Sequence, residues 1–226
     1  ADDPPVHRDR PGSEEPVIYY ANPSTEAIRD AISGGLLGCI TTPAQGNVTF
    51  PDEWDVIADN GCFSGKWTHG AWFSWLLDQP RRFRFVVAPD VFDPSGSPCH
   101  NATAEKWEMY GPLIERHGFV PAFVAQVGCE PHLLPDDAPV VFLGGTTEWK
   151  LGPAEDVARK AKSDGRWVHM GRVNSQRRMV RALEMGCDSA DGTFLTFGPD
   201  VNLPRLLRYI DTAHAMSAQM TFGDVA

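Results

Sequence analysis

Short apolar runs alternate with segments of helical periodicity along this chain. Most runs are continuously apolar rather than alternating in polarity, which is typical of strands covered on both faces, as parallel strands are. Eight strand and helix units in 226 residues predict an α/β fold. A single (β/α)8 TIM barrel is the first choice, and a doubly wound open sheet is the alternative. The eight runs are 17–21, 36–42, 55–61, 82–91, 119–128, 139–145, 166–173 and 189–193.

The segments between the runs carry helix signals. Residues 66–79 place tryptophans at helical spacing, and such stripes usually face a core rather than a bound base. Asn174 or Ser175 is expected to cap the basic helix that follows the seventh run. The first fifteen residues are polar and lack the apolar core of a signal peptide. We therefore expect a mobile tail over 1–15 and one barrel domain over 16–226.

The composition is that of an ordinary globular protein, and no apolar run approaches the roughly 20 residues that a membrane span needs, so we expect no membrane association. Five cysteines are odd in number and form no CxxC pair, which predicts reduced thiols in a cytoplasm. The net charge of −10 argues against non-specific coating of nucleic acid. Local arginine clusters can still form a positive patch, and solvated surface arginines are the alternative. The cluster that leads towards Asp191 contains Arg172, Arg177 and Arg178.

Acidic, amide and glycine residues follow several of the predicted strands. Because the C-terminal strand ends of a barrel converge on one mouth, these residues are expected to share a pocket. Three carboxylates around one cavity repel each other and raise at least one pKa. Metal binding, general acid–base catalysis, or a nucleophile beside a proton donor would each use such a set. The residues are Asp59, Asp90, Gln126, Gly144, Gly145 and Asp191.

Other interpretations of these residues remain open. Asp191 precedes a glycine and could simply cap a turn. Hard cations want several oxygen ligands, but the chain has no Asp-x-Asp or His-x-His pair, so we expect neither a metal nor a cofactor. His169 lies within the seventh run, where it is either a core histidine or part of the pocket floor. Paired carboxylates can also displace and protonate a leaving group at a glycosidic carbon, and amide and backbone groups can read the edge of a purine.

These residues resemble the tRNA-guanine transglycosylases, and more closely the smaller DNA-modifying 7-deazaguanine transglycosylases of phages and bacteria (DpdA type). The resemblance runs from about residue 55 to 193. The segment IADNGCF is similar to the family's TDSGGF motif, which implies that Asp59 is the general acid/base. APDV occupies the place of the guanine-recognising aspartate, which implies that role for Asp90. AQVG looks like the VQGG motif and implies that Gln126 reads the base edge.

The later motifs extend the resemblance. LGG is similar to the IGGL turn, which implies that Gly144 and Gly145 present backbone N–H groups to the purine carbonyl. Met170-Gly171 matches the strand end MGVG, and Met170, together with His169 on the pocket floor, is expected to bind the substrate. The segment CDSADG corresponds to the one that bears the nucleophile, which falls on Asp191.

The chain departs from the tRNA enzymes in two ways. It lacks their CxCxxC…H zinc subdomain, and it is much shorter. The resemblance therefore favours DNA over tRNA as the partner, with a 7-deazaguanine such as 7-cyano-7-deazaguanine as the incoming base. It implies a cytoplasmic enzyme, in the host cytoplasm if phage-encoded. The target nucleotide has to leave the stack.

The remaining expectations concern the surface around the base. Phe63 and Trp149 could stack on it, although packing roles are equally open. Arg172, Arg177 and Arg178 are the candidate phosphate contacts. A non-catalytic nucleic-acid-binding barrel subunit and a nucleoside hydrolase remain the alternative functions, and the oligomeric state is left open.

Overall fold

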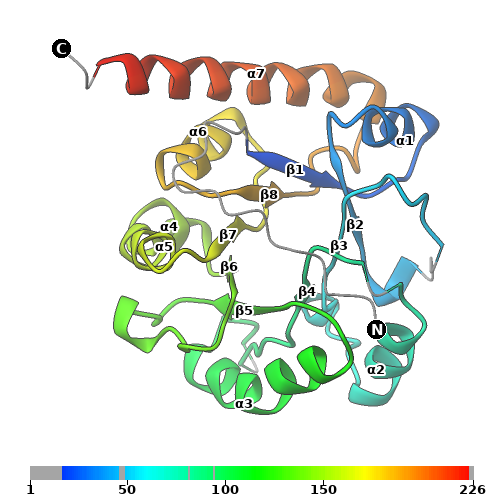
Figure 1. Ribbon diagram of the computed structural model, residues 1–226, viewed down its shortest axis with the longest axis vertical. Coiled ribbons are helices and arrows are strands. Elements are labelled where there is room, and N and C mark those ends of the chain that lie inside the picture. Colours follow the sequence, from blue (N-terminus) through cyan, green and yellow to red (C-terminus); the bar gives the residue numbers. More distant parts are fainter. Residues whose placement is uncertain (1–16, 46–48, 81, 94, 224–226) are drawn as a thin grey trace, which may run out of the picture.

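The computed structural model describes residues 17–45, 49–80, 82–93 and 95–223. Eight parallel strands close into a barrel in chain order, so the predicted TIM barrel is confirmed and the open sheet is wrong (Figure 1). The expected tail over 1–15 lies outside the described residues. The strands are β1 Ile18–Ala21, β2 Gly38–Thr41, β3 Val56–Ala58, β4 Val86–Val87, β5 Pro121–Ala125, β6 Val140–Leu143, β7 Trp167–Met170 and β8 Ser189–Asp191.

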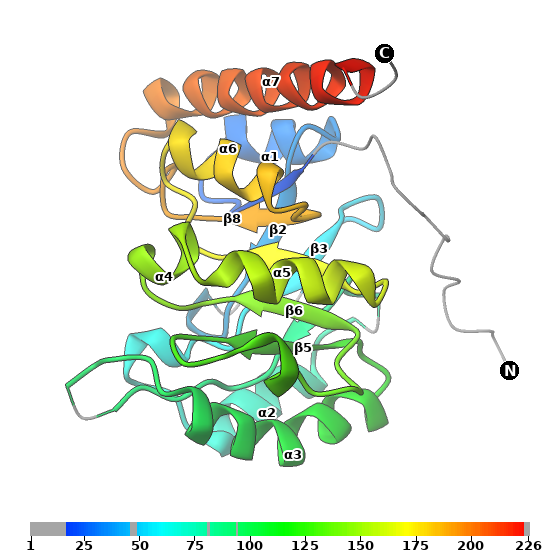
Figure 2. The ribbon, with the colours of Figure 1, turned by 90° about the vertical axis from the view of Figure 1, so that its left-hand side faces the viewer.

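Helices surround the barrel. Figure 2 shows α7 lying across the outer sides of α1 and α6. Among the described residues, no helix is both long and apolar enough to cross a membrane. The α-helices are α1 Glu26–Ser33, α2 His69–Leu77, α3 His100–Arg116, α4 Thr147–Leu151, α5 Ala154–Ser163, α6 Gln176–Glu184 and α7 Pro199–Gly223, and the 3₁₀ turns are η1 Pro43–Gln45, η2 Cys62–Ser64 and η3 Pro131–Leu133.

One strand differs from the sequence expectation. The fourth strand is shorter than the run 82–91, because only Val86 pairs with β3 and only Val86 and Val87 pair with β5. The segment after β6 forms the short helix α4. The Thr146 hydroxyl accepts a hydrogen bond from the N–H of Trp149, and the burial of Trp149 anchors this single turn.

Side-chain caps set the start of several helices. Thr25 accepts from the N–H of Ile28 in α1, at 3.4 Å. Ser175, rather than Asn174, accepts from the N–H of Arg178 at the start of α6. Such caps satisfy N–H groups that have no partner within the helix.

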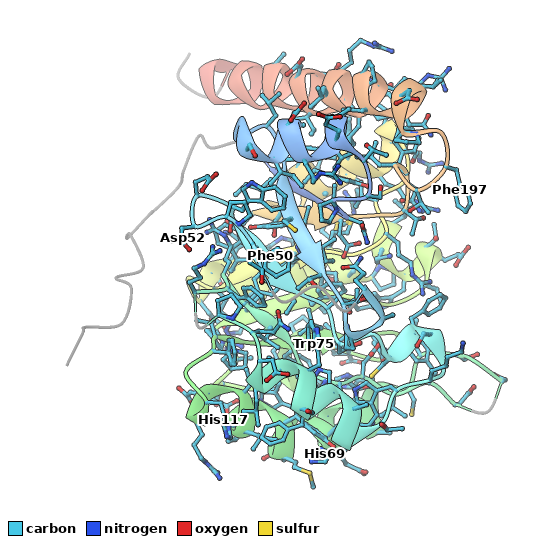
Figure 3. The ribbon with its side chains drawn as sticks, turned by 90° about the vertical axis from the view of Figure 1, so that its right-hand side faces the viewer. Phe50, Asp52, His69, Trp75, His117 and Phe197 are labelled. Atoms are coloured by element: carbon cyan, nitrogen blue, oxygen red, sulfur yellow. The ribbon has the colours of Figure 1, made fainter. Side chains whose placement is uncertain are left out.

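Two apolar layers hold the barrel together. Residues such as Tyr20, Ile57 and Phe85 fill the interior of the barrel. A larger layer packs between the strands and the helices, and it contains the tryptophans Trp72 and Trp75 of α2. Trp75 is labelled in Figure 3. The tryptophans of this helix are therefore packing residues, as the sequence predicted. All five cysteines are free thiols.

A polar cluster closes the N-terminal end of the barrel interior. The Tyr20 hydroxyl donates to Asp55, at 2.8 Å, and the Arg84 guanidinium forms a 2.7 Å ion pair with the same carboxylate. Arg84 also lies over the Trp167 ring, 4.6 Å from its centroid. Because conserved chemistry in such barrels sits at the opposite end, this cluster is expected to serve stability.

Replacement of Tyr20 by Phe tests this role. The change removes one buried donor to a charged acceptor, which should lower the free energy of unfolding by about 1–3 kcal/mol. Urea denaturation measures the loss as a lower midpoint at unchanged slope. Tyr209→Phe on the outer helix α7 is the control. An unchanged midpoint for Tyr20→Phe would show that the cluster is not stabilising.

Candidate active site at the barrel mouth

A cavity of about 250 Å³ opens at the C-terminal ends of the strands. Its walls are apolar where Ile40, Val87, Val124 and Phe142 project from β2, β4, β5 and β6. The volume lies just below the roughly 300 Å³ at which ordinary small-molecule pockets begin, which suits a fragment the size of one base. The carboxylates that line it are Asp59, Asp90 and Asp191.

The predicted site residues fall into three groups. Six of them line the cavity, namely Asp59, Phe63, Asp90, Gly144, Arg172 and Asp191. His169 lies beneath Asp191, and Gln126 lies behind Asp90. The cavity lining does not include Gly145, Met170, Arg177 or Arg178.

Asp191 is held by donors on both oxygens. Oδ1 accepts the backbone N–H of Arg172 at 2.9 Å, and Oδ2 lies 3.2 Å from Nε2 of His169. Burial by itself would raise the pKa of Asp191. The hydrogen bond and charge of His169, the Arg172 N–H and the charge of Lys150 outweigh burial and hold that pKa below its usual range. Asp191 is therefore ionised at neutral pH.

A line of hydrogen bonds orients His169. The indole N–H of Trp167 donates to the Ser189 hydroxyl at 2.8 Å, and that oxygen lies 2.8 Å from Nδ1 of His169. An indole only donates, so the single hydroxyl proton of Ser189 is free to point at Nδ1. In the neutral imidazole the hydrogen then sits on Nε2, where it faces Asp191. The ring is fully buried and stacks on Phe142, 4.7 Å between centroids.

Strand alternation explains why Met170 does not reach the cavity. On β7, Trp167 and His169 point into the barrel, so Met170 points outwards and packs in the layer beneath the helices. Met170 was expected beside the base, but its side chain does not line the cavity. Gly171, one residue further along, lines the cavity instead.

Asp59 has a different environment from Asp191. It follows β3 and accepts the backbone N–H of Gly61 at a long 3.4 Å. Burial, reinforced by the negative charges of Asp191 and Asp90, raises the pKa of Asp59 to about 7. Asp59 therefore retains its proton in a large fraction of molecules at neutral pH.

Asp90 is braced by two amides. Its Oδ1 accepts from Asn60 at 3.1 Å, and its Oδ2 accepts from Gln126 at 2.8 Å. Gln126 is fully buried, and its Oε1 accepts the Thr103 hydroxyl at 2.9 Å. Burial raises the pKa of Asp90 despite the Asn60 hydrogen bond. Gln126 thus orients Asp90 from behind rather than facing the cavity.

Phe63 and Arg172 form an open rim. The Phe63 side chain is 68% exposed and meets Phe92 edge to face at 5.8 Å. The guanidinium of Arg172 lies 3.5 Å from the centroid of the Phe63 ring. Phe63 is thus an accessible aromatic surface at the mouth.

Trp149 is buried and its ring occupies the space beside Gly145, so in this structure it has the packing role that was the alternative to stacking. The two remaining arginines lie outside the cavity. Arg178 donates to the carbonyl of Arg172 at 3.0 Å and to the Thr147 hydroxyl at 3.1 Å, so it supports the loop after β7. Arg177 lies on the outer surface of α6 beside Val180.

The sequence interpretation missed several residues. Asn22 and Thr42 follow β1 and β2 and line the cavity, and the rule that strand ends converge would have found them. Asn60 stands directly beside Asp59 in the chain. Lys150 is only 3% exposed, and it gave no periodic signal. Among the described residues, no group of three or more His, Cys, Asp or Glu side chains is arranged to hold a metal ion.

Comparisons with known proteins support the fold. No family model matches the sequence, and no curated protein matches it. The chain is similar to a cube-shaped protein cage designed by fusing symmetric oligomeric domains, with a TM-score of 0.52 and 11% identity over 94% of this chain and 76% of that chain. It is also similar to QR15, an aldolase, with a TM-score of 0.50 and 14% identity over 84% and 96% of the two chains. At these identities the likeness shows a shared fold alone.

The raised pKa of Asp59 predicts a pH-dependent gain from Asp59→Asn. Between about pH 4 and pH 7 the unfolded chain releases a proton that the folded protein keeps, so the wild type loses stability as pH rises through this window. Asp59→Asn does not lose this stability, because its side chain cannot ionise. Its free energy of unfolding should exceed the wild-type value by about 1–3 kcal/mol at pH 8 and match it at pH 4, the gain being reduced by partial solvent access.

Urea denaturation at pH 4, 6 and 8 measures this difference. The exposed Asp136→Asn serves as the matched control and should show no such trend. A constant difference across the three pH values would mean that folding does not raise the pKa of Asp59.

Proposed function

We propose that this barrel is a base-exchange transglycosylase, which replaces guanine in nucleic acid by a 7-deazaguanine through a covalent aspartyl–sugar intermediate. DNA is the favoured polymer, and 7-cyano-7-deazaguanine is a suitable incoming base. One observation carries the proposal: an ionised carboxylate, Asp191, and a proton-retaining carboxylate, Asp59, line the same small cavity. This is the division of roles that displacement at a glycosidic carbon requires.

The first half of the reaction forms the intermediate. An Asp191 oxygen attacks C1′ of the target nucleotide, and the bond from C1′ to N9 of guanine breaks. The electron pair goes to the purine, and Asp59 donates its proton to the departing base. His169 and the Arg172 N–H orient the attacking carboxylate.

The second half reverses these steps with a new base. Asp59, now ionised, takes the N9 proton of the incoming 7-deazaguanine. The ring nitrogen then attacks C1′, and the Asp191 carboxylate departs. Because Asp59 gives one proton and takes one back, the cycle is balanced without a cofactor or water.

Base recognition is assigned to Asp90 and the rim. Asp90, braced by Asn60 and Gln126, can accept from the N–H groups on the guanine edge. Of the glycine pair, Gly144 lines the cavity but its N–H is used in a hydrogen bond to the Ala125 carbonyl, and Gly145 does not line the cavity, so neither is assigned a contact with the base. Phe63 is an exposed ring on which a base can stack.

The polymer has to deliver a single nucleotide to this mouth. A base inside a stacked duplex cannot enter a recess of about 250 Å³, so the target nucleotide must be flipped out or lie in a single strand. Arg172 at the rim and Arg177 near the start of α6 are the proposed phosphate contacts. The net charge of −10 implies that binding depends on this local cluster and weakens as salt is added.

Incorporation of labelled base tests the proposal. The wild type, incubated with duplex DNA and labelled guanine or 7-cyano-7-deazaguanine, should place label in the polymer. Asp191→Asn removes the nucleophile and should reduce incorporation by at least about 10³-fold. Asp156→Asn on the exposed face of α5 is the matched control.

Three outcomes would contradict the assignment in different ways. Unchanged incorporation by Asp191→Asn would remove the nucleophile role. Release of base from free nucleosides without any polymer would favour a nucleoside hydrolase. Binding of DNA with no incorporation and no covalent complex would favour a non-catalytic subunit.

The proton on Asp59 predicts the pH profile. The first step needs the protonated acid, so kcat/KM should fall about tenfold per unit as pH rises beyond about 7. Asp59→Asn should lose about 10²- to 10⁴-fold in rate and lack this descending limb. Initial rates of label incorporation between pH 5 and 9 measure both effects. A limb that persists in the variant would assign the titration to another group.

A further inference from the structure

Lys150 is a buried cation that the steps proposed above do not use. It belongs to α4, and its side chain is only 3% exposed. Its Nζ donates to the carbonyl oxygen of Gly171 at 2.6 Å. Lysine is almost never fully buried unless its charge is compensated, so its position below the mouth needs a partner charge.

The partner charge of Lys150 is Asp191, and a single peptide group connects the two side chains. The carbonyl that Lys150 binds and the N–H that Asp191 accepts both belong to the peptide between Gly171 and Arg172. In a trans peptide these two groups point in opposite directions, and the described chain has no cis peptide bond. The ammonium and the carboxylate therefore lie at the two ends of one peptide dipole. Each hydrogen bond polarises the peptide and strengthens the other.

The backbone at this point is held in an uncommon conformation. Arg172 has φ 60°, the one positive φ at a non-glycine position among the described residues. L residues rarely adopt this region, and they persist there when surrounding contacts hold them. Lys150 binds the peptide that precedes Arg172, and Arg178 donates to the carbonyl that follows it, at 3.0 Å. Lys150 and Arg178 thus hold the backbone on the two sides of Arg172, whose N–H donates to Asp191.

The charges of the two residues also act on each other. Burial lowers the pKa of Lys150 to about 8, and the charge of Asp191 opposes that fall, whereas Arg172 and Arg178 add to it. In the other direction, Lys150 joins His169 among the groups that keep the pKa of Asp191 low. A neutral side chain at position 150 would leave Asp191 with less compensation for its burial.

We propose that Lys150 is a positioning residue which, through the peptide between Gly171 and Arg172, keeps Asp191 ionised and directed into the cavity. This inference rests on the proposed function for its catalytic meaning. The interaction between Lys150 and Asp191 that it requires can be measured without any reaction.

A double-mutant cycle on unfolding measures that coupling. Lys150→Met keeps the apolar stem and removes the charge, and Asp191→Asn removes the opposite charge. At pH 7 the double variant should lose clearly less in urea midpoint than the sum of the two single losses. Lys160→Met, an exposed lysine paired with Asp164, is the matched control and should be additive with Asp191→Asn. Additivity at Lys150 as well would overturn the proposal.

A second measurement covers the case in which Lys150→Met does not fold. The pKa of Lys150 is followed by NMR of protein carrying ¹³C-labelled lysine, in the wild type and in Asp191→Asn. Removal of the facing negative charge should lower the pKa of Lys150 further, while the signal of Lys160 stays unchanged. An identical Lys150 titration in both proteins would overturn the proposal.

Kinetics then separate a positioning role from a purely structural one. Lys150→Met should reduce kcat for base incorporation about 10²-fold with little change in KM, because a misplaced nucleophile affects the chemical step. The rate should fall at low pH, where Asp191 takes up a proton. In Lys150→Met this acidic limb should lie at higher pH than in the wild type, and Lys150→Arg should return it to the wild-type position. An unshifted limb would overturn the proposal. A wild type that shows the coupling but no incorporation would instead overturn the proposed function and leave the link between Lys150 and Asp191 in place.

Discussion

Three carboxylates share one small recess, and this crowding of negative charge governs how the mouth of the barrel is built. Parallel strands deliver Asp59, Asp90 and Asp191 to the same end of the sheet. Charges this poorly solvated cannot all be ionised together without a large cost. The protein resolves the conflict by giving each acid a different set of donors. Asp191 receives two donors and lies near positive charge, Asp90 receives two side-chain amides, and Asp59 receives backbone N–H groups alone.

The donors to Asp191 come from the register of the last two strands. His169 on β7 pairs with Ser189 on β8, so the inward-facing residues of the two strands lie side by side. That pairing allows Ser189 to hold one side of the imidazole while the other side faces Asp191. A shift of one residue would turn these side chains towards the helices. The protonation pattern at the mouth is thus a consequence of strand pairing.

The fold and the three acids could be predicted from the sequence, because both depend on local signals. Continuous apolar runs mark buried parallel strands, and an aspartate near the C-terminal end of such a run is expected at the mouth. Asp59, Asp90 and Asp191 were found in this way.

The positions of other residues could not be predicted, because they depend on side-chain direction and on contacts between distant parts of the chain. Met170 lies one position out of phase with the inward side of β7, and Gln126 is drawn behind Asp90 by Thr103. Lys150 sits on a single helical turn whose burial comes from contacts far away in the chain. No helical or strand periodicity points to such a residue, because its partner is a backbone carbonyl of the next strand's loop.

The hydrogen-bonded line from Trp167 to Asp191 runs along the interior of the barrel from its closed end to its open one. The indole stands over Arg84 below and restricts the rotation of the Ser189 hydroxyl above. If the indole were lost, that hydroxyl could turn away and the imidazole could carry its hydrogen on the other nitrogen. Trp167, at the closed end of the barrel, thus contributes both to the polar cluster there and to the choice of the His169 tautomer that faces Asp191 at the open end.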